Sequence, residues 1–193
     1  NLPKSGYIAA RESLPFLLAG SLFFFVTLIM VSRFGSKMLL RLSQQALTDS
    51  LSRMPNRRAL RHAIIAEETA GRPFGLALID LDGFKNVNDC YGHAVGDRLI
   101  RKVGEYLLQV AGEDGMVARL GGDEFAILIR GKFSAKALQQ ISERFLEWLH
   151  FPIMIEDRSI SVGASIGVVT TSKEKAGDGE MLRRADIAMY SAK

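Results

Sequence analysis

The sequence predicts an α/β domain, an α+β sandwich in which helices flank a mainly antiparallel sheet, with a transmembrane helix in front of it. Three observations predict this. A charge-free apolar stretch lies near the N-terminus, at residues 14–32. Strand-like and helix-like segments then alternate in the order β-α-β-β-α-β, which is typical of a sheet layered with helices. Between two of these segments lies a Gly121-Gly122 turn, which predicts a hairpin of antiparallel strands.

The apolar stretch at residues 14–32 is close to the ~20 residues that a helix needs to cross a bilayer. A buried helix of a soluble domain is the alternative, but such helices are rarely apolar on every side. Arg33, Lys37 and Arg41 follow the stretch closely, and fewer basic residues precede it. By the positive-inside rule we therefore expect residues 1–13 outside the cytoplasm and the C-terminal bulk inside it.

Composition narrows the class of protein. Cys90 is the single cysteine, so no disulfide forms within the chain, which fits a reducing compartment. The net charge of +4 suits an anionic ligand or the surface of a lipid bilayer. Nucleic acid is not expected as a partner, because no basic stripe is interleaved with aromatic residues.

Residues 33–47 predict a helical connector. Leu39, Leu42 and Ala46 recur at spacings of three and four, which indicates either a short coiled coil between two copies of the chain or a plain amphipathic helix. A further helix is expected from Arg57 to Ala70, with its apolar residues on one side.

The remaining elements follow in order. Residues 74–80 form a continuous apolar run, which predicts a buried central strand ending at Asp80. Residues 95–110 carry an apolar stripe at helical spacing. After the hairpin, the pattern predicts a helix at 135–149, a strand at 160–169 and a helix at 180–193.

Carboxylates gather where the central strand and the hairpin end. Asp80 would be costly to bury unless it binds a cation or hydrogen-bond donors. Mg²⁺ prefers carboxylate and carbonyl oxygens, so Asp80, the Leu81 carbonyl and Asp123 would supply part of its shell if the strand and the hairpin are neighbours. Lys85 places a positive charge where phosphates would lie. The alternative is a strand-end turn with solvated acids.

The segment after the central strand carries residues suited to a purine base. An Asp can accept from both the N1–H and the exocyclic amine of guanine, and an Asn can both donate and accept. Asp97 and Asn88 are the candidates, although such residues are more often turn or capping residues. His93 is equally a packed loop histidine or a ligand.

Together these motifs resemble the GGDEF family of diguanylate cyclases, from about Thr48 to Lys193. In chain order the matching residues are Asp49, Pro55-Asn56-Arg57-Arg58, Asp80-Leu81-Asp82, Phe84-Lys85, Asn88-Asp89, Gly92-His93, Gly96-Asp97, Arg119-Leu120-Gly121-Gly122-Asp123-Glu124-Phe125, Ser165-Ile166-Gly167 and Ala185-Asp186-Ile187-Ala188-Met189-Tyr190-Ser191-Ala192-Lys193.

The resemblance implies a ferredoxin-like or palm-like nucleotide cyclase fold, with the GGDEF domain at residues 48–193. It implies a diguanylate cyclase that condenses two GTP into cyclic di-GMP and two pyrophosphates, in bacterial second-messenger signalling. Two domains of a homodimer would face each other, each holding one GTP. With the predicted transmembrane helix, it also implies a location at the bacterial inner membrane, with the catalytic domain in the cytoplasm.

The resemblance also implies roles for individual residues. Asp80, the Leu81 carbonyl, Asp123 and Glu124 would hold Mg²⁺, or Mn²⁺ in its place. Either Asp123 or Glu124 would help to deprotonate the 3′-hydroxyl; we favour Asp123, but the sequence does not separate the two. Lys85 would stabilise charge on the phosphates. The residues expected to contact substrate are Asn88, His93, Asp97, Gly121 and Gly122.

The chain departs from the family pattern in two places. Many cyclases carry an inhibitory Arg-x-x-Asp site, where this chain has Gly112 and Gly115. We expect no product inhibition there; tight cyclic di-GMP binding that is lost on changing Glu113 and Asp114 would contradict this. The chain also ends at Lys193, where family members continue, so we expect an incomplete C-terminal end. An alternative is therefore a catalytically silent, GTP-sensing module of a longer cyclic di-GMP phosphodiesterase, with a sensory domain upstream.

Overall fold

The computed structural model describes residues 23–33, 47–171 and 180–193. The chain divides into two compact units, residues 1–46 and residues 47–193. The predicted extracytoplasmic segment at 1–13 lies outside the described residues, and so does the predicted connector except at its ends. The folded domain described below is the second unit.

The predicted location at the bacterial inner membrane is wrong by what the described part of the chain shows. The transmembrane helix predicted at residues 14–32 falls partly outside the described residues and stays a prediction. None of the described helices combines the length and the apolar character that crossing a bilayer requires. The helix in question is described at residues 23–33. Residues 14–22 lie outside the described residues.

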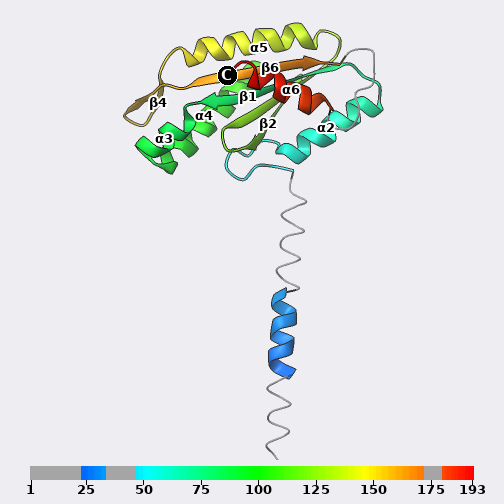
Figure 1. Cartoon of the computed structure of the whole chain (residues 1–193), viewed down its shortest axis with the longest axis vertical. Coiled ribbons are helices and arrows are strands. Elements are labelled where there is room, and N and C mark those ends of the chain that lie inside the picture. The colour runs from blue at the N-terminus through cyan, green and yellow to red at the C-terminus, as the bar shows by residue number, and fades with distance from the viewer. Residues whose placement is uncertain (1–22, 34–46, 172–179) are drawn as a thin grey trace, which may run out of the picture. The chain divides into compact units, whose positions relative to one another are not determined.

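The second unit is built on a four-stranded sheet with the order β2-β3-β1-β6. The strands are β1 (Phe74–Asp82), β2 (Gly115–Gly121), β3 (Glu124–Arg130) and β6 (Gly163–Thr170). Every neighbouring pair is antiparallel. The predicted β-α-β-β-α-β order and the central hairpin are thereby confirmed (Figure 1).

Helices cover both faces of this sheet. The helices α2 (Arg57–Thr69) and α6 (Glu180–Tyr190) share one apolar cluster with Phe74, Leu76 and Leu78 of β1. The helices α4 (His93–Ala111) and α5 (Ser134–Leu149) share the other cluster with the alternating residues of β1. Successive side chains of a strand point to opposite faces, so a strand covered on both sides is apolar throughout. Asp80, two residues after Leu78, therefore lies on the face of α2 and α6.

Two parts of the domain differ from the prediction. The helix α3 (Phe84–Tyr91) was not predicted; it has eight residues and buries only Val87. A separate hairpin of β4 (Ile153–Ile155) and β5 (Arg158–Ile160) precedes β6. The predicted strand at 160–169 merges the end of this hairpin with β6, because strands of three residues are too short for a periodic signal.

Candidate active site

The β2–β3 turn carries the Gly121-Gly122 pair in conformations that favour glycine. Gly121 has φ of 141° and Gly122 has φ of 52°. Arg119 holds the turn, since its Nη2 donates to the Gly122 carbonyl at 2.8 Å. A residue with a Cβ is strained in this region of φ, so the two glycines let the turn bend sharply and leave its backbone open to a ligand.

Arg119 also ties the turn to the segment that enters the domain. Its Nη1 lies 2.8 Å from Oδ1 of Asp49, and the side chains are 12% and 20% exposed. The same Asp49 oxygen accepts from the Ser52 backbone N–H and hydroxyl, each at 2.8 Å. Burial alone would raise the pKa of Asp49, but the hydrogen bonds from Ser52 and Arg119 outweigh it and lower that pKa. Both partners are therefore charged at neutral pH.

Asp80 and Asp123 converge beside this turn. The Leu81 N–H donates to the Asp123 carbonyl at 3.3 Å, which brings the end of β1 against the hairpin. Asp123 is half-buried, and its pKa is raised by this burial and by the negative charge of Asp80. Two crowded carboxylates with an adjacent backbone carbonyl are a donor set that a hard divalent cation would neutralise.

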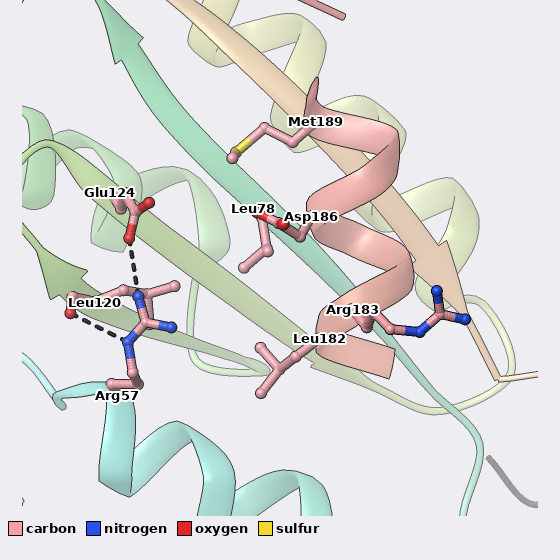
Figure 2. A pocket seen from close by; sticks show the side chains of 8 residues that line it. All are labelled: Arg57, Leu78, Leu120, Glu124, Leu182, Arg183, Asp186 and Met189. Carbon is pink, nitrogen blue, oxygen red and sulfur yellow. Dashed lines mark hydrogen bonds and ion pairs between the residues drawn. The ribbon is translucent and has the colours of Figure 1, made fainter. Parts of the chain in front are cut away.

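Glu124 is adjacent to Asp123 in sequence but has a different partner. Its Oε2 lies 2.9 Å from Nη2 of Arg57, the first residue of α2, and Arg57 Nε also donates to the Leu120 carbonyl at 3.4 Å (Figure 2). Among the described residues no group of three or more His, Cys, Asp or Glu side chains is arranged to hold a metal. The structure thus brings Asp80, Leu81 and Asp123 together, and it leaves Glu124 paired with α2.

Asp80 has a cationic partner of its own. Lys193 Nζ lies 3.0 Å from Asp80 Oδ1, and this hydrogen bond raises the pKa of the lysine. Asp80 and Glu124 are direct cross-strand partners on one face, and like charges in that position repel. Lys193 and Arg57 each neutralise one of them. Asp82 lies one pleat further along, where it accepts from the Ser165 hydroxyl at 3.0 Å.

The candidate base-reading residues lie on α3 and α4, which meet at Gly92. Asn88 is half-buried and packs against Gly96, so closely that a Cβ on Gly96 would lie 2.0 Å from its Oδ1. Asp97, the next residue of α4, is exposed. Lys85 in the first turn of α3 and His93 at the start of α4 are exposed as well. The structure therefore places Asn88 close to the α4 turn that carries Asp97.

A cavity of about 270 Å³ opens on the face of α2 and α6, behind the hairpin. Figure 2 shows the Arg57–Glu124 ion pair on one side of it, with Leu182 and Met189 of α6 opposite. The residues that line it are Arg57, Leu78, Leu120, Glu124, Leu182, Arg183, Asp186 and Met189. Sequence reasoning assigned no role to Arg57, whose importance depends on a contact across 67 residues.

Comparison with known proteins places these features in a family. The family described as "Diguanylate cyclase, GGDEF domain" matches residues 46–193. The chain belongs to the GGDEF family. Its GGDEF domain contains every described element from α2 to α6.

Relatives of this GGDEF domain occur in longer proteins. It is 37% identical over 157 residues to the cyclic di-GMP phosphodiesterase PdeR of Escherichia coli, an alignment that covers 79% of the chain and 23% of PdeR. It is 35% identical over 161 residues to the diguanylate cyclase TpbB of Pseudomonas aeruginosa, covering 79% of the chain and 36% of TpbB. The chain thus spans a quarter to a third of the length of these relatives.

Solved GGDEF structures share the fold. The GGDEF domain of PA1120 (TpbB or YfiN) from Pseudomonas aeruginosa matches with a TM-score of 0.69 and 30% identity, over 76% of this chain and 88% of that one. The coiled coil and GGDEF domain of DgcB from Caulobacter crescentus, in complex with c-di-GMP, matches with a TM-score of 0.66 and 28% identity, over 93% of each chain. The predicted α+β fold is confirmed.

Proposed function

We propose that this GGDEF domain is a diguanylate cyclase that condenses two GTP into cyclic di-GMP. In each half of the reaction the 3′-oxygen of one GTP attacks the α-phosphorus of the other. The bond from that phosphorus to the β-phosphate breaks, pyrophosphate leaves, and the hydroxyl proton passes to a carboxylate. The observation that carries the proposal is the convergence of Asp80 and Asp123 beside the Gly121-Gly122 turn.

Asp80, the Leu81 carbonyl and Asp123 would hold a divalent cation, Mg²⁺ or Mn²⁺ in its place. Such an ion would neutralise charge on the triphosphate and on the leaving pyrophosphate. Two carboxylates and a carbonyl suffice for Mg²⁺, since this ion keeps several waters or substrate oxygens as ligands. The raised pKa of Asp123 supports this role, because burial and the nearby charge of Asp80 both disfavour its carboxylate and a bound cation would offset both.

The contacts of the two adjacent acids favour Asp123 as the group that accepts the hydroxyl proton. An arginine partner stabilises the charged form of a carboxylate and so makes it a weaker proton acceptor. The Glu124 carboxylate is paired with Arg57, whereas Asp123 lies beside Asp80, whose charge disfavours its ionised form. Glu124 would then position the end of β3 instead of holding the metal.

The remaining roles follow the distribution of charge and hydrogen-bonding groups. Asn88 and Asp97 would bind the guanine edge, and their approach across the α3–α4 junction supports this pairing. Lys85 would contact the phosphates, and His93 would lie beside the substrate. Gly121 and Gly122 would let the backbone of the turn approach the nucleotide closely.

One domain holds one GTP, so catalysis would need two copies whose hairpins face each other. We expect the initial rate per mole of protein to rise with protein concentration until dimers saturate. A rate strictly proportional to concentration from nanomolar to micromolar protein would contradict this arrangement.

The test is incubation of the full chain with GTP and Mg²⁺, followed by chromatography of the nucleotide products. We expect cyclic di-GMP and two pyrophosphates per cyclic product, and none of either from Asp123→Asn. Glu124→Gln is the matched control, since it neutralises the adjacent acid, and we expect it to retain more activity than Asp123→Asn. Equal loss in both variants would overturn the assignment of Asp123.

A second candidate is a catalytically silent, GTP-sensing module of a longer cyclic di-GMP phosphodiesterase. It is favoured by the similarity to PdeR, of which this chain covers only 23%. The same incubation separates the two functions. GTP binding by calorimetry with no cyclic product at any protein concentration would support the sensor and exclude the cyclase.

A further inference from the structure

We propose that the β4–β5 hairpin is a clamp that positions the guanine-binding residues, through Arg158 and Glu156. The inference rests on the proposed function, because it takes Asn88 and Asp97 as the residues that bind the base. The clamp acts on the elbow, defined as residues 91–93 between α3 and α4. It has three parts: a contact to the end of α3, contacts to α4, and an apolar anchor.

Arg158 holds the end of α3. Its guanidinium carbon lies 5.7 Å from the centre of the Tyr91 ring, within the range of a cation–π contact. Its Nη1 also donates to the Tyr91 carbonyl at 3.4 Å. Carbonyls at the end of a helix lack intrahelical partners, and a cation there is favoured by the helix dipole. One side chain from β5 thus engages both the ring and the backbone of the last residue of α3.

The turn and the first strand of the hairpin hold α4. Glu156 forms an ion pair with Arg98, the residue that follows Asp97. One turn further along, Lys102 Nζ donates to the Met154 carbonyl at 2.8 Å. The hairpin therefore contacts both helices that flank the elbow: Tyr91 is three positions after Asn88, Arg98 is adjacent to Asp97, and Lys102 is five positions after Asp97.

Glu156 adopts a backbone conformation that costs stability. It has φ of 54°, and only one other described non-glycine residue has a positive φ. Glycine would adopt this conformation without strain at the tip of a two-residue hairpin turn. A glutamate that keeps it, with its carboxylate on Arg98, suggests that the side chain serves the contact with α4 more than the hairpin itself.

The hairpin is rigid enough to act as a clamp because its inner face is buried. Ile153, Ile155 and Ile160 are 5%, 2% and 1% exposed and belong to the same apolar cluster as Val95 and Leu99 of α4. Arg158 lies on this same face, since it is the cross-strand partner of Ile155 and stands two residues before Ile160. Figure 1 shows the hairpin extending beside α3, away from the main sheet. The buried isoleucines thus fix the hairpin to the core, and the hairpin in turn restrains the elbow.

The test measures nucleotide affinity with the full chain in Arg158→Gln and Glu156→Gly. The probes are GTP and inosine triphosphate, which lacks the exocyclic amine, each titrated by calorimetry with Mg²⁺. A cation–π contact at an exposed site corresponds to about a two- to fivefold change in an equilibrium constant. We expect Arg158→Gln to weaken GTP by about that factor, to weaken inosine triphosphate less, and so to reduce the preference for GTP. Arg158→Lys should restore part of the preference.

Glu156→Gly separates positioning from stability. It removes the contact to Arg98 but relieves the backbone strain, so the melting temperature should stay the same or rise while the preference for GTP falls. Lys136→Gln on α5 is the control, because it removes the same charge from an exposed site. Its nucleotide affinities should equal those of the unaltered chain.

An unchanged ratio of the two affinities in both Arg158→Gln and Glu156→Gly would overturn the clamp, provided that the unaltered chain prefers GTP. A loss shared equally by both nucleotides would overturn it as well, since that outcome indicates a general disturbance. If the unaltered chain bound neither nucleotide, the proposed function would fail, and the clamp with it.

Discussion

Glu67 offers a quantitative test of how α2 is fixed to the sheet. Its side chain is 3% exposed and pairs with two arginines, Arg72 at 2.6 Å and Arg130 at 2.8 Å. These hydrogen bonds, led by that from Arg72 and opposed by burial, lower the pKa of Glu67 from 4.5 to about 2. The ion pairs link the end of α2 to the loop before β1 and to the end of β3. Glu67→Gln removes the charge at nearly constant volume.

The magnitude follows from the lowered pKa. A pKa of about 2 instead of 4.5 corresponds to about 3 kcal/mol in favour of the charged form in the folded state. The two arginine side chains are 59% and 49% exposed, so water screens the interaction. We therefore expect Glu67→Gln to lower the free energy of unfolding by about 1–2 kcal/mol at pH 7, a drop of roughly 3–6 °C in melting temperature.

The sign of the pH dependence is set by the direction of the pKa change. Because the folded-state pKa lies below the unfolded one, the stabilisation is complete above about pH 4.5 and is lost as the pH falls toward 2. Urea unfolding of both proteins at pH 7, 5 and 3 should give curves that differ at the first two values and approach each other at the third. Glu180→Gln, at a more exposed carboxylate with two arginine partners, should change stability less.

A Glu67→Gln variant as stable as the unaltered chain at pH 7 would show that these ion pairs do not stabilise the fold. A stability difference that persists unchanged at pH 3 would show that the loss comes from packing and not from the charge.

Three further predictions concern close contacts in the domain. Gly96→Ala would put a Cβ 2.0 Å from Oδ1 of Asn88 and so displace the Asn88 side chain. With one hydrogen bond to the base lost, the GTP affinity measured by calorimetry should fall about two- to tenfold. An unchanged affinity would show that Asn88 does not bind the base. Gly167→Ala would put a Cβ 2.2 Å from a backbone nitrogen of α6. This overpacking should lower the free energy of unfolding in urea by about 1–3 kcal/mol. An equally stable variant would show that α6 can shift. Arg57→Ala removes the partner that lies 2.9 Å from the Glu124 carboxylate. The initial rate of pyrophosphate release should fall about fivefold, which corresponds to a barrier higher by about 1 kcal/mol. A higher rate would indicate instead that the ion pair restrains the site.

Sequence patterns predicted the sheet and its major helices because these depend on local periodicity. Residues 74–79 are apolar without a break before Asp80, and β1 is buried on both faces. The proximity of Asp80 to Asp123 was also predictable, since a central hairpin beside the buried strand brings the two ends together. Both follow from which residues are buried.

Other features depend on contacts that leave no local signal. The ion pair of Arg57 with Glu124 joins residues 67 positions apart, so neither residue's neighbours in sequence announce it. The β4–β5 hairpin has strands too short for periodicity, and its importance lies in the helices that it contacts. The membrane location was predicted from the composition of residues 14–32 alone, and none of the described helices has both the length and the apolar character to support it.

The contacts of Arg119 connect the segment at the start of the domain to the hairpin of the candidate active site. The Leu47 carbonyl accepts from the Asn56 N–H at 2.9 Å, and the Pro55 carbonyl accepts from the Arg119 N–H at the same distance. A displacement of Leu47 would therefore be transmitted toward the Gly121-Gly122 turn through these two hydrogen bonds, which involve the neighbouring residues Pro55 and Asn56, without crossing the sheet. We therefore expect a displacement of Leu47 to disturb the β2–β3 hairpin before it disturbs α5. A signal that moves the start of the domain would therefore need no long chain of contacts to alter the geometry of Asp123.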